Sequence, residues 1–315
     1  MENRKYSLII NGDDLGLSES VNQSLLWAAD KGILSSLSLM VNMPEADQAL
    51  IDLAEIRKEN PEFRPGLGLH FCLTSGRALS DPADIPDLAD TNGRFRCGFL
   101  SLLRGVHKKS FLDQIQREFS LQFERFLEYK GKYDLIMDHL DSHQHIHCIP
   151  GIFDLLRKTA EKYEIVLRIT HEEFGSTARF FRSICKRIPG GIAKKIILDT
   201  LLWKSRCGLR RSGSDRVGYF GIIDTGKMDE SSILAITRVI PKIARRSGIQ
   251  AFEINLHPWD FDQTDLTGLD VSEDDRIFAS STWRKQEWNA LMNPANILNS
   301  MEKEGIRLAR FADLR

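Results

Sequence analysis

Acidic residues and histidines in this chain lie at the places where short apolar runs end. Asp13 and Asp14 follow the run "SLII" near the beginning of the chain, and His70 ends the run "GLGLH". His143 follows "LIMDHLDS", and His257 ends "FEINLH". One carboxylate and two imidazoles form a ligand set that leaves open positions on a divalent metal ion for water and substrate. These residues are therefore candidates for a metal site, provided that the fold brings the ends of the runs together.

Each of these residues also has an ordinary structural explanation. An Asp-Asp pair is common in turns and at helix N-caps, although Ser18 can cap the helix predicted to follow. A single histidine at a strand end, or the His-Pro of "NLHPWD", is common without any ligand role. The segment "HLDSHQHIH", residues 139–147, is different, because it holds four of the eight histidines of the chain. This density favours metal binding or catalysis over a fortuitous loop.

Strand-like and helix-like patterns alternate along the chain, which positions the candidate residues. Alternation of this kind predicts an α/β fold with a parallel sheet and crossover helices, either open or closed into a barrel. The carboxyl ends of parallel strands meet at one rim, so residues remote in sequence converge there. The predicted strands are 6–10, 35–41, 66–71, 133–140, 164–170 and 250–257, and the predicted helices are 19–32, 45–59, 111–131 and 151–163.

The composition limits the class of protein. The 315 residues are 42% hydrophobic and 28% charged, which allows a full core and argues against bulk disorder. The net charge of -1 lacks the overall basic character of a nucleic-acid-binding protein, and we expect no nucleic-acid partner. Five cysteines without CxxC spacing indicate neither a disulfide framework nor a zinc ribbon. The apolar run near the start is too short for a signal peptide, so we expect a cytoplasmic location.

Two segments depart from the alternating pattern. Residues 75–98 are rich in Pro, Gly and Asp and predict a long loop of functional importance or high mobility. Residues 178–216 carry eleven Lys or Arg against two Asp, a net charge of about +9, together with many apolar residues. This basic amphipathic insertion is either a solvated helical pair or a surface that contacts an anionic membrane and reaches a glycolipid.

Four motifs in order resemble one known family. "NGDDLGLS", "GLHFCLT", "HLDSHQHIH" and "LHP" are similar to motifs of the YdjC-like carbohydrate deacetylases. The resemblance covers residues 5 to about 260, and the loop "DPADIPDLADTNGRF" looks more like the hopanoid-biosynthesis-associated branch than the chitooligosaccharide branch. It implies a distorted (β/α) TIM-like barrel of the polysaccharide-deacetylase type, formed as a single domain by residues 1–315. It also implies metal-dependent removal of acetyl groups from N-acetylated amino sugars.

The resemblance assigns roles to individual residues. Asp14, His70 and His143 match the metal ligands of the family. Asp13 matches the aspartate that acts as general base, and His257 matches the late histidine that acts as general acid. A bound ion lowers the pKa of water and polarises the acetyl carbonyl. The resemblance favours magnesium, whereas the ligand types also suit zinc, manganese, cobalt or iron.

Three more residues belong to the candidate site. Asp141 can accept a hydrogen bond from a ligand histidine. His145 and His147 alternate in phase with His143, so all three point to one side if this segment is extended. We expect His145 and His147 to contact the sugar or to support the ligands. The sequence leaves open whether the chain forms a homo-oligomer.

Two other functions remain open from the sequence. A metal-dependent phosphoesterase also uses Asp and His clusters at a barrel rim, but commonly holds two metal ions with more ligands. A non-catalytic sugar-binding protein on the same barrel has no need of all five residues Asp13, Asp14, His70, His143 and His257. The deacetylase is therefore the preferred hypothesis.

Overall fold

The structure is a computed structural model, and it describes residues 5–172, 189–205, 217–260 and 271–314. Within these ranges no helix combines the length and the apolar character that crossing a membrane requires.

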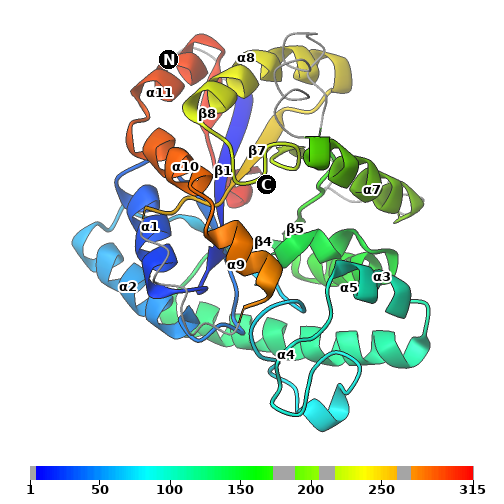
Figure 1. Cartoon of the computed structure of the whole chain (residues 1–315). Coiled ribbons are helices and arrows are strands. Elements are labelled where there is room, and N and C mark those ends of the chain that lie inside the picture. Colours follow the sequence, from blue (N-terminus) through cyan, green and yellow to red (C-terminus); the bar gives the residue numbers. More distant parts are fainter. Residues whose placement is uncertain (1–4, 173–188, 206–216, 261–270, 315) are drawn as a thin grey trace.

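Strands and helices alternate through most of the chain, as the sequence predicts (Figure 1). The strands are β1 (Tyr6–Leu15), β2 (Ser36–Leu39), β3 (Gly66–Phe71), β4 (Met137–Ser142), β5 (Val166–Leu167), β6 (Val217–Phe220), β7 (Ala251–Leu256) and β8 (Ile306–Leu308). The α-helices are α1 (Glu19–Asp30), α2 (Ala46–Glu59), α3 (Phe99–Gly105), α4 (Lys109–Tyr133), α5 (Pro150–Tyr163), α7 (Pro189–Ser205), α8 (Glu230–Ser247), α9 (Glu273–Ala279), α10 (Trp283–Met292) and α11 (Ala295–Lys303). Short 3₁₀ turns are η1 (Pro82–Asp84), η2 (His143–Cys148) and η6 (Phe311–Leu314).

The strands form one parallel sheet in the order β5-β4-β3-β2-β1-β7-β6, and β8 pairs with the beginning of β1. The sheet curls, and an isolated parallel bridge between Glu172, after β5, and Tyr219 of β6 joins its two ends. The predicted α/β fold of distorted TIM-like barrel type is confirmed in this form, an irregular half-barrel rather than a regular ring of eight strands.

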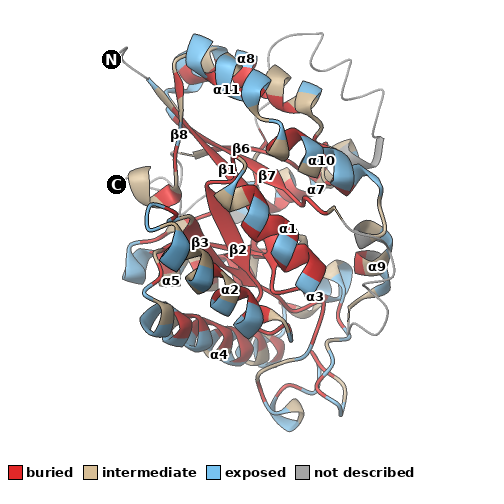
Figure 2. Ribbon diagram, turned by 90° about the vertical axis from the view of Figure 1, so that its left-hand side faces the viewer, coloured by how far each residue is buried: buried red, intermediate tan, exposed pale blue. Residues whose placement is uncertain are grey.

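Burial explains why the chain folds this way. Every residue of β2, β3, β4 and β7 is buried, as expected for strands of a parallel sheet covered by helices. The helices turn a buried face toward the sheet and an exposed face to solvent (Figure 2). Ser18 caps α1, because its side chain accepts a hydrogen bond from Val21 N, as the sequence predicts. The two aspartates upstream are therefore not needed for that cap.

The end of β1 is irregular where the aspartates lie. The pairing of β1 with β2 shifts between Gly12 and Leu15, and Asp14 has a left-handed backbone with φ 71°. Such a backbone costs roughly 1–3 kcal/mol in a residue other than glycine. It breaks the strict alternation of side chains along a strand, so Asp13 and Asp14 both face the same cavity.

The two unusual segments differ in how much of them is described. Residues 75–98 form a long loop that contains η1 and is held by backbone pairing, for example between Ala78 N and Gly93 O at 2.8 Å. Of the basic insertion at 178–216, only α7 is described, and residues 178–188 and 206–216 lie outside the described part of the chain.

Candidate active site at the carboxyl ends of the strands

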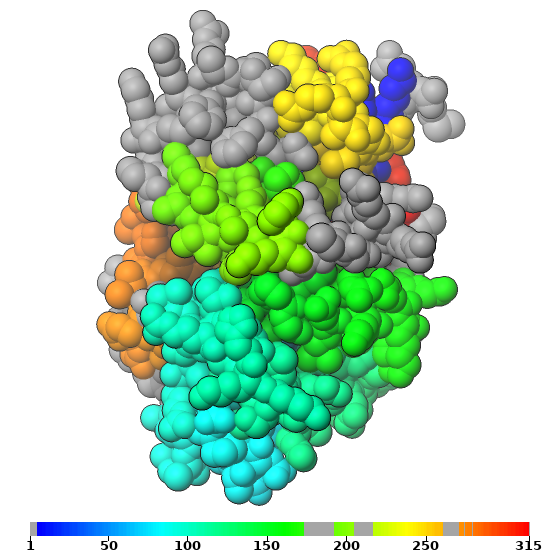
Figure 3. Space-filling view, turned by 90° about the vertical axis from the view of Figure 1, so that its right-hand side faces the viewer, coloured from blue at the N-terminus to red at the C-terminus, as the bar shows by residue number. Residues whose placement is uncertain are grey.

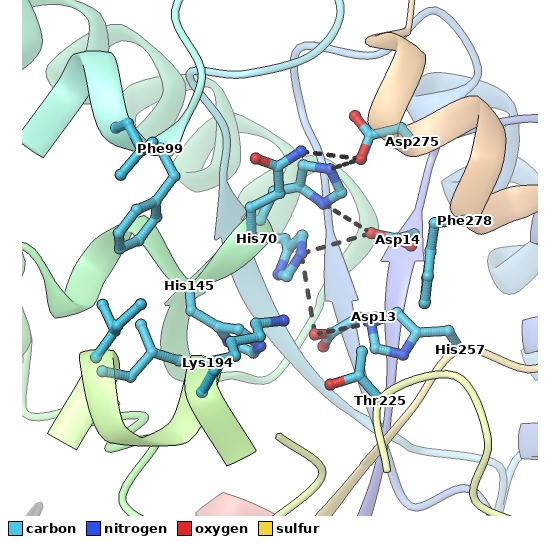
Figure 4. A pocket seen from close by; sticks show the side chains of 16 residues that line it. Asp13, Asp14, His70, Phe99, His145, Lys194, Thr225, His257, Asp275 and Phe278 are labelled. Atoms are coloured by element: carbon cyan, nitrogen blue, oxygen red, sulfur yellow. Dashed lines mark hydrogen bonds and ion pairs between the residues drawn. The ribbon is translucent and has the colours of Figure 1, made fainter. Parts of the chain in front are cut away.

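The five residues singled out at the ends of the apolar runs come together in space. Asp13, Asp14, His70, His143 and His257 all line one cavity of about 530 Å³ at the carboxyl ends of the strands (Figure 4). We call these five residues the strand-end cluster. Each of them is less than 10% exposed. The parallel sheet therefore does what the sequence analysis required, since it gathers residues from four separate stretches of the chain at one rim.

Asp14, His70 and His143 have the spacing of a metal-binding group. Asp14 Oδ1 lies 3.0 Å from His143 Nδ1 and 3.6 Å from His70 Nε2. Ligand atoms about 2.1 Å from one ion lie roughly 3–4 Å from one another. The three residues therefore fit a divalent ion, with one carboxylate and two imidazole ligands.

The pKa values of Asp14 and His143 each depend on the charge of the other residue. Burial by itself raises the pKa of Asp14, but the hydrogen bond and charge of His143 lower it to about 2. Burial alone lowers the pKa of His143, but the charges of Asp275 and Asp14 raise it well above its ordinary value. The site thus keeps the Asp14 carboxylate ionised and attracts a positive charge between the carboxylates, whether a proton or a metal ion.

Asp141 orients the ring of His70 through a hydrogen bond on the side away from Asp14. Its Oδ1 accepts a hydrogen bond from His70 Nδ1 at 2.8 Å, and its Oδ2 accepts one from Ser38 Oγ at 2.8 Å. With a proton on Nδ1, His70 presents the lone pair of Nε2 toward Asp14 and Asp13. This is the usual carboxylate–histidine arrangement behind a metal ligand.

Asp13 is held by partners that the sequence analysis did not identify. Arg168 donates to both of its oxygens at 2.9 Å, and Asn11 and Asn255 donate to it at 2.8 and 2.9 Å. Burial by itself raises the pKa of Asp13, but Arg168, and then His70 and His257, lower it well below the ordinary value. Asp13 is therefore an oriented carboxylate that stays ionised. An arginine within the predicted strand 164–170 was the available signal, but the strand alone did not show what it faces.

Arg168 also contacts a second group of potential ligands, which shares Asp13 and His70 with the strand-end cluster. Asp13, His70 and Asp141 are close enough together to hold an ion. However, Arg168 Nη1 lies 2.9 Å from Asp13 and 2.5 Å from Asp141, and its Nη2 lies 2.7 Å from Glu253. A guanidinium already occupies these carboxylates, so a second metal ion here would meet a fixed positive charge.

His257 lies on the other side of Asp13. Its Nε2 is 3.8 Å from Asp13 Oδ2. Its ring packs edge-on against the ring of Phe278, with 5.0 Å between the ring centroids. The backbone fixes it, because its N–H donates to Glu287 and its carbonyl accepts from Arg284 Nε, both at 2.7 Å. Burial lowers the pKa of His257 to about 4, against the opposing charges of Asp14 and Asp13.

The segment after His143 is not extended, so the condition under which His143, His145 and His147 would point to one side is not met. Residues His143–Cys148 form the 3₁₀ turn η2, and Gln144 and His145 have left-handed backbones with φ 53° and 58°. The side chains therefore do not alternate in phase. His145 lines the cavity, whereas His147 points into the interior, where its Nδ1 lies 2.7 Å from Ser142 Oγ. Burial lowers the pKa of His147 to about 3, so it is neutral.

Asp275 of α9 joins the site from far along the chain and was not singled out in the sequence. Its Oδ1 lies 2.9 Å from His143 Nε2 and 3.1 Å from Gln144 Nε2 (Figure 4). Nothing in "SEDDRIF" distinguishes this aspartate from its neighbours, because its position depends on how α9 packs. Arg284, whose Nε donates to the carbonyl of His257, was also missed, because its position depends on how α10 packs.

The opposite side of the cavity is apolar. Phe99 and Leu100 of α3 face Ile197 and Leu198 of α7, and we call these four residues the apolar wall. Lys194, also from α7, is the one Lys or Arg among the described residues that line the cavity. Burial lowers its pKa to about 8. The cavity thus has a charged side built from strand ends and an apolar side built from helices.

Comparison with known proteins shows which sequences and which fold this chain resembles. The sequence profile of the YdjC-like proteins matches residues 7–297. A carbohydrate deacetylase of Geobacillus stearothermophilus is 39% identical over 161 residues, which are 51% of this chain and 58% of that protein. A chitooligosaccharide deacetylase of Yersinia enterocolitica is 33% identical over 166 residues, 53% of this chain and 60% of that protein. The matches thus span less than two thirds of the length of either relative.

A solved structure resembles the whole fold. It is a protein of Enterococcus faecalis V583 provisionally named a cellobiose-phosphate cleavage protein, with a TM-score of 0.67. The superposition covers 98% of this chain and 99% of that one at 21% sequence identity. At this identity the likeness supports the barrel-type fold alone.

Proposed function

The chain belongs to the YdjC-like protein family, and we propose that it is a metal-dependent hydrolase that removes the acetyl group from N-acetylated amino sugars. The observation that carries this proposal is the strand-end cluster, in which a metal-binding group lies beside an ionised carboxylate and a further imidazole. The relatives named carbohydrate deacetylase and chitooligosaccharide deacetylase support the reaction class.

The geometry supports a role for each residue. Asp14, His70 and His143 would hold a divalent ion, which when bound would supply Lewis-acid activation of water and of the acetyl carbonyl. Magnesium is the ion that the family resemblance favours. Asp13 takes a proton from the attacking water, because Arg168 and two asparagines orient its carboxylate without neutralising it. Arg168 acts through Asp13 and is a positioning residue.

His257 delivers a proton to the departing amine nitrogen. Because its pKa is about 4, His257 is neutral at pH 7 before substrate binds, and it has to gain a proton during turnover. Asp13 Oδ2 lies 3.8 Å from its Nε2, so the proton that Asp13 takes from water can pass to His257 and then to the amine. The acetyl carbon gains the water oxygen, the C–N bond breaks, and acetate and amine leave.

The apolar wall bears on the choice of substrate between an N-acetylglucosaminyl oligosaccharide and a glycolipid. Sugar rings need hydrogen-bonding partners, whereas Phe99, Leu100, Ile197 and Leu198 offer none. Leu100 is 61% exposed and Ile197 is 48% exposed, and Ile196 and Trp203 add further exposed apolar surface along α7. Figure 3 shows α7 beside the segment that contains α3 on this face of the molecule. This supports a glycolipid with an apolar group on the wall and peripheral membrane contact through α7.

An acetate-release assay tests the proposal. Metal-loaded protein is incubated with soluble chitooligosaccharides and, separately, with N-acetylglucosaminyl lipids in detergent. We expect acetate from at least one class, faster from the lipid, and no acetate after chelation. Absence of acetate from both classes, with metal bound, would overturn the deacetylase assignment and favour a sugar-binding protein. Phosphate release from a sugar phosphate would instead support a phosphoesterase, which Arg168 argues against because it occupies the carboxylates of a second metal group.

A further inference from the structure

We infer that Asp275 of α9 is a positioning residue for His143, which fixes the ring so that Nδ1 faces the ion position beside Asp14. The inference rests on the proposed function, because it concerns a residue that supports a proposed metal ligand. It adds a part of the site that comes from a helix after the last strand of the rim.

The contacts of Asp275 carry the inference. Its side chain is buried, and its Oδ1 accepts hydrogen bonds from His143 Nε2 at 2.9 Å and from Gln144 Nε2 at 3.1 Å. Its Oδ2 accepts from Ser272 Oγ at 2.6 Å and from Ser75 Oγ. Asp275 is thus held from both sides, by its own helix and by the loop after β3, and cannot easily turn away from His143.

The chemistry of an imidazole makes this contact directional. A neutral ring carries its proton on one nitrogen and a lone pair on the other. A carboxylate facing Nε2 requires the proton there, which leaves the lone pair on Nδ1. His143 Nδ1 is the atom that lies 3.0 Å from Asp14 Oδ1, where the ligand atoms of the group converge. Asp275 therefore selects the tautomer that can bind a metal ion.

The same arrangement, with the nitrogens exchanged, exists at His70. There Asp141 faces Nδ1 at 2.8 Å, and Nε2 points to the ion position. Each ligand histidine thus has its own carboxylate, one from β4 and the other from α9. Asp141 comes from the same strand that leads to His143, whereas Asp275 lies 132 positions after it. The site is completed only when α9 is packed over the rim.

The test compares metal affinity in wild type, Asp275→Ala and Asp275→Asn by calorimetric titration of Zn²⁺ into the purified full-length chain. We expect Asp275→Ala to bind Zn²⁺ roughly 10–100-fold more weakly, the usual effect of removing a carboxylate behind a ligand histidine. Asp275→Asn keeps an acceptor oxygen and should recover most of the affinity. In the Zn²⁺-loaded protein, ¹⁵N spectra of the histidine rings should show a protonated Nε2 on His143 in wild type and a changed pattern in Asp275→Ala.

Glu273→Ala is the matched control. Glu273 is an exposed acidic residue of the same helix, so its replacement removes a carboxylate from α9 and leaves the contacts of Asp275 in place. We expect less than threefold weaker Zn²⁺ binding. Equal affinity of Asp275→Ala and wild type, or equal losses in Glu273→Ala and Asp275→Ala, would overturn the inference and leave the proposed function standing. A wild-type protein that binds no divalent ion would overturn both.

Discussion

The two sides of the cavity are built on different principles. The strand-end cluster is polar and buried, its members lie at the carboxyl ends of parallel strands, and side-chain hydrogen bonds among the described residues hold all of them except His257. The apolar wall comes from helices α3 and α7, and two of its four residues are about half exposed or more. This difference separates the chemistry, which needs fixed charges, from substrate selection, which needs a surface of suitable shape and polarity. A variant on one side should therefore change the reaction step, and a variant on the other should change which substrate is used.

The largest expected effect is that of Asp13→Asn on catalysis. The amide cannot take a proton, so acetate release should fall roughly 10²–10⁴-fold on every substrate. Metal binding should persist, because Asp13 is not a member of the group Asp14, His70 and His143. The measurement is kcat together with metal content. Wild-type activity in this variant would eliminate Asp13 as the base.

The next largest effect is expected on stability, from Arg168→Leu. This change leaves the carboxyl groups of Asp13, Asp141 and Glu253 buried without their shared cation. The free energy of unfolding should fall by about 3–5 kcal/mol. The control is Arg117→Leu, whose ion pair with Asp84 at 3.2 Å is half exposed, and it should cost about 1 kcal/mol or less. Similar losses in denaturant titrations of the two variants would show that the cluster does not depend on Arg168.

A smaller effect on stability, which depends on pH, is expected at Glu172. This buried carboxyl lies outside the strand-end cluster, and its pKa is shifted in the opposite direction to those of the cluster's aspartates. Burial raises the pKa of Glu172 to about 7, against hydrogen bonds from the N–H groups of Ile223 and Ile222, whereas the aspartates of the cluster have lowered pKa values. Since the folded pKa lies above that of the unfolded chain, the stabilising contribution is complete below about pH 4.5 and is lost as the pH rises through about 7. Glu172→Gln cannot titrate, and its oxygen can still accept these hydrogen bonds.

The stability of Glu172→Gln relative to wild type should therefore increase between about pH 4.5 and pH 7, by up to roughly 3 kcal/mol. Chemical denaturation of both proteins across this range measures the difference. A difference that stays constant with pH, or that shrinks as the pH rises, would contradict the raised pKa.

The smallest effect is expected at the apolar wall, and it should be selective. The double variant Leu100→Ser and Ile197→Ser removes exposed apolar surface from the cavity, so the KM for a lipid-linked substrate should rise roughly tenfold. The KM for short soluble chitooligosaccharides should not change. The matched control is Leu298→Ser, because Leu298 of α11 is 42% exposed, does not line the cavity and is not part of the apolar surface of α7. Equal KM changes for both substrates would break the division between the two sides of the cavity.

Much of the fold and part of the site could be predicted from the sequence. Alternating apolar runs and amphipathic segments predict a parallel sheet with outer helices, open or closed, and the family resemblance added the distorted barrel that the structure confirms. The carboxyl ends of such strands share one rim, so the five residues of the strand-end cluster could be grouped without coordinates, and the family resemblance assigned Asp14, His70 and His143 as the ligands. Asp141 could also be named, because it lies in the strand that leads to His143.

The tertiary structure alone decided the orientation and support of these residues. The left-handed backbone at Asp14 turns both aspartates into the cavity, and the kink at Gln144 and His145 turns His147 away from it. Arg168, Asp275 and the apolar wall depend on how distant strands and helices pack, and no local pattern records those contacts. A sequence specifies which side chains follow a strand through periodicity, which is local, whereas the partner of a buried charge is set by packing across the whole chain.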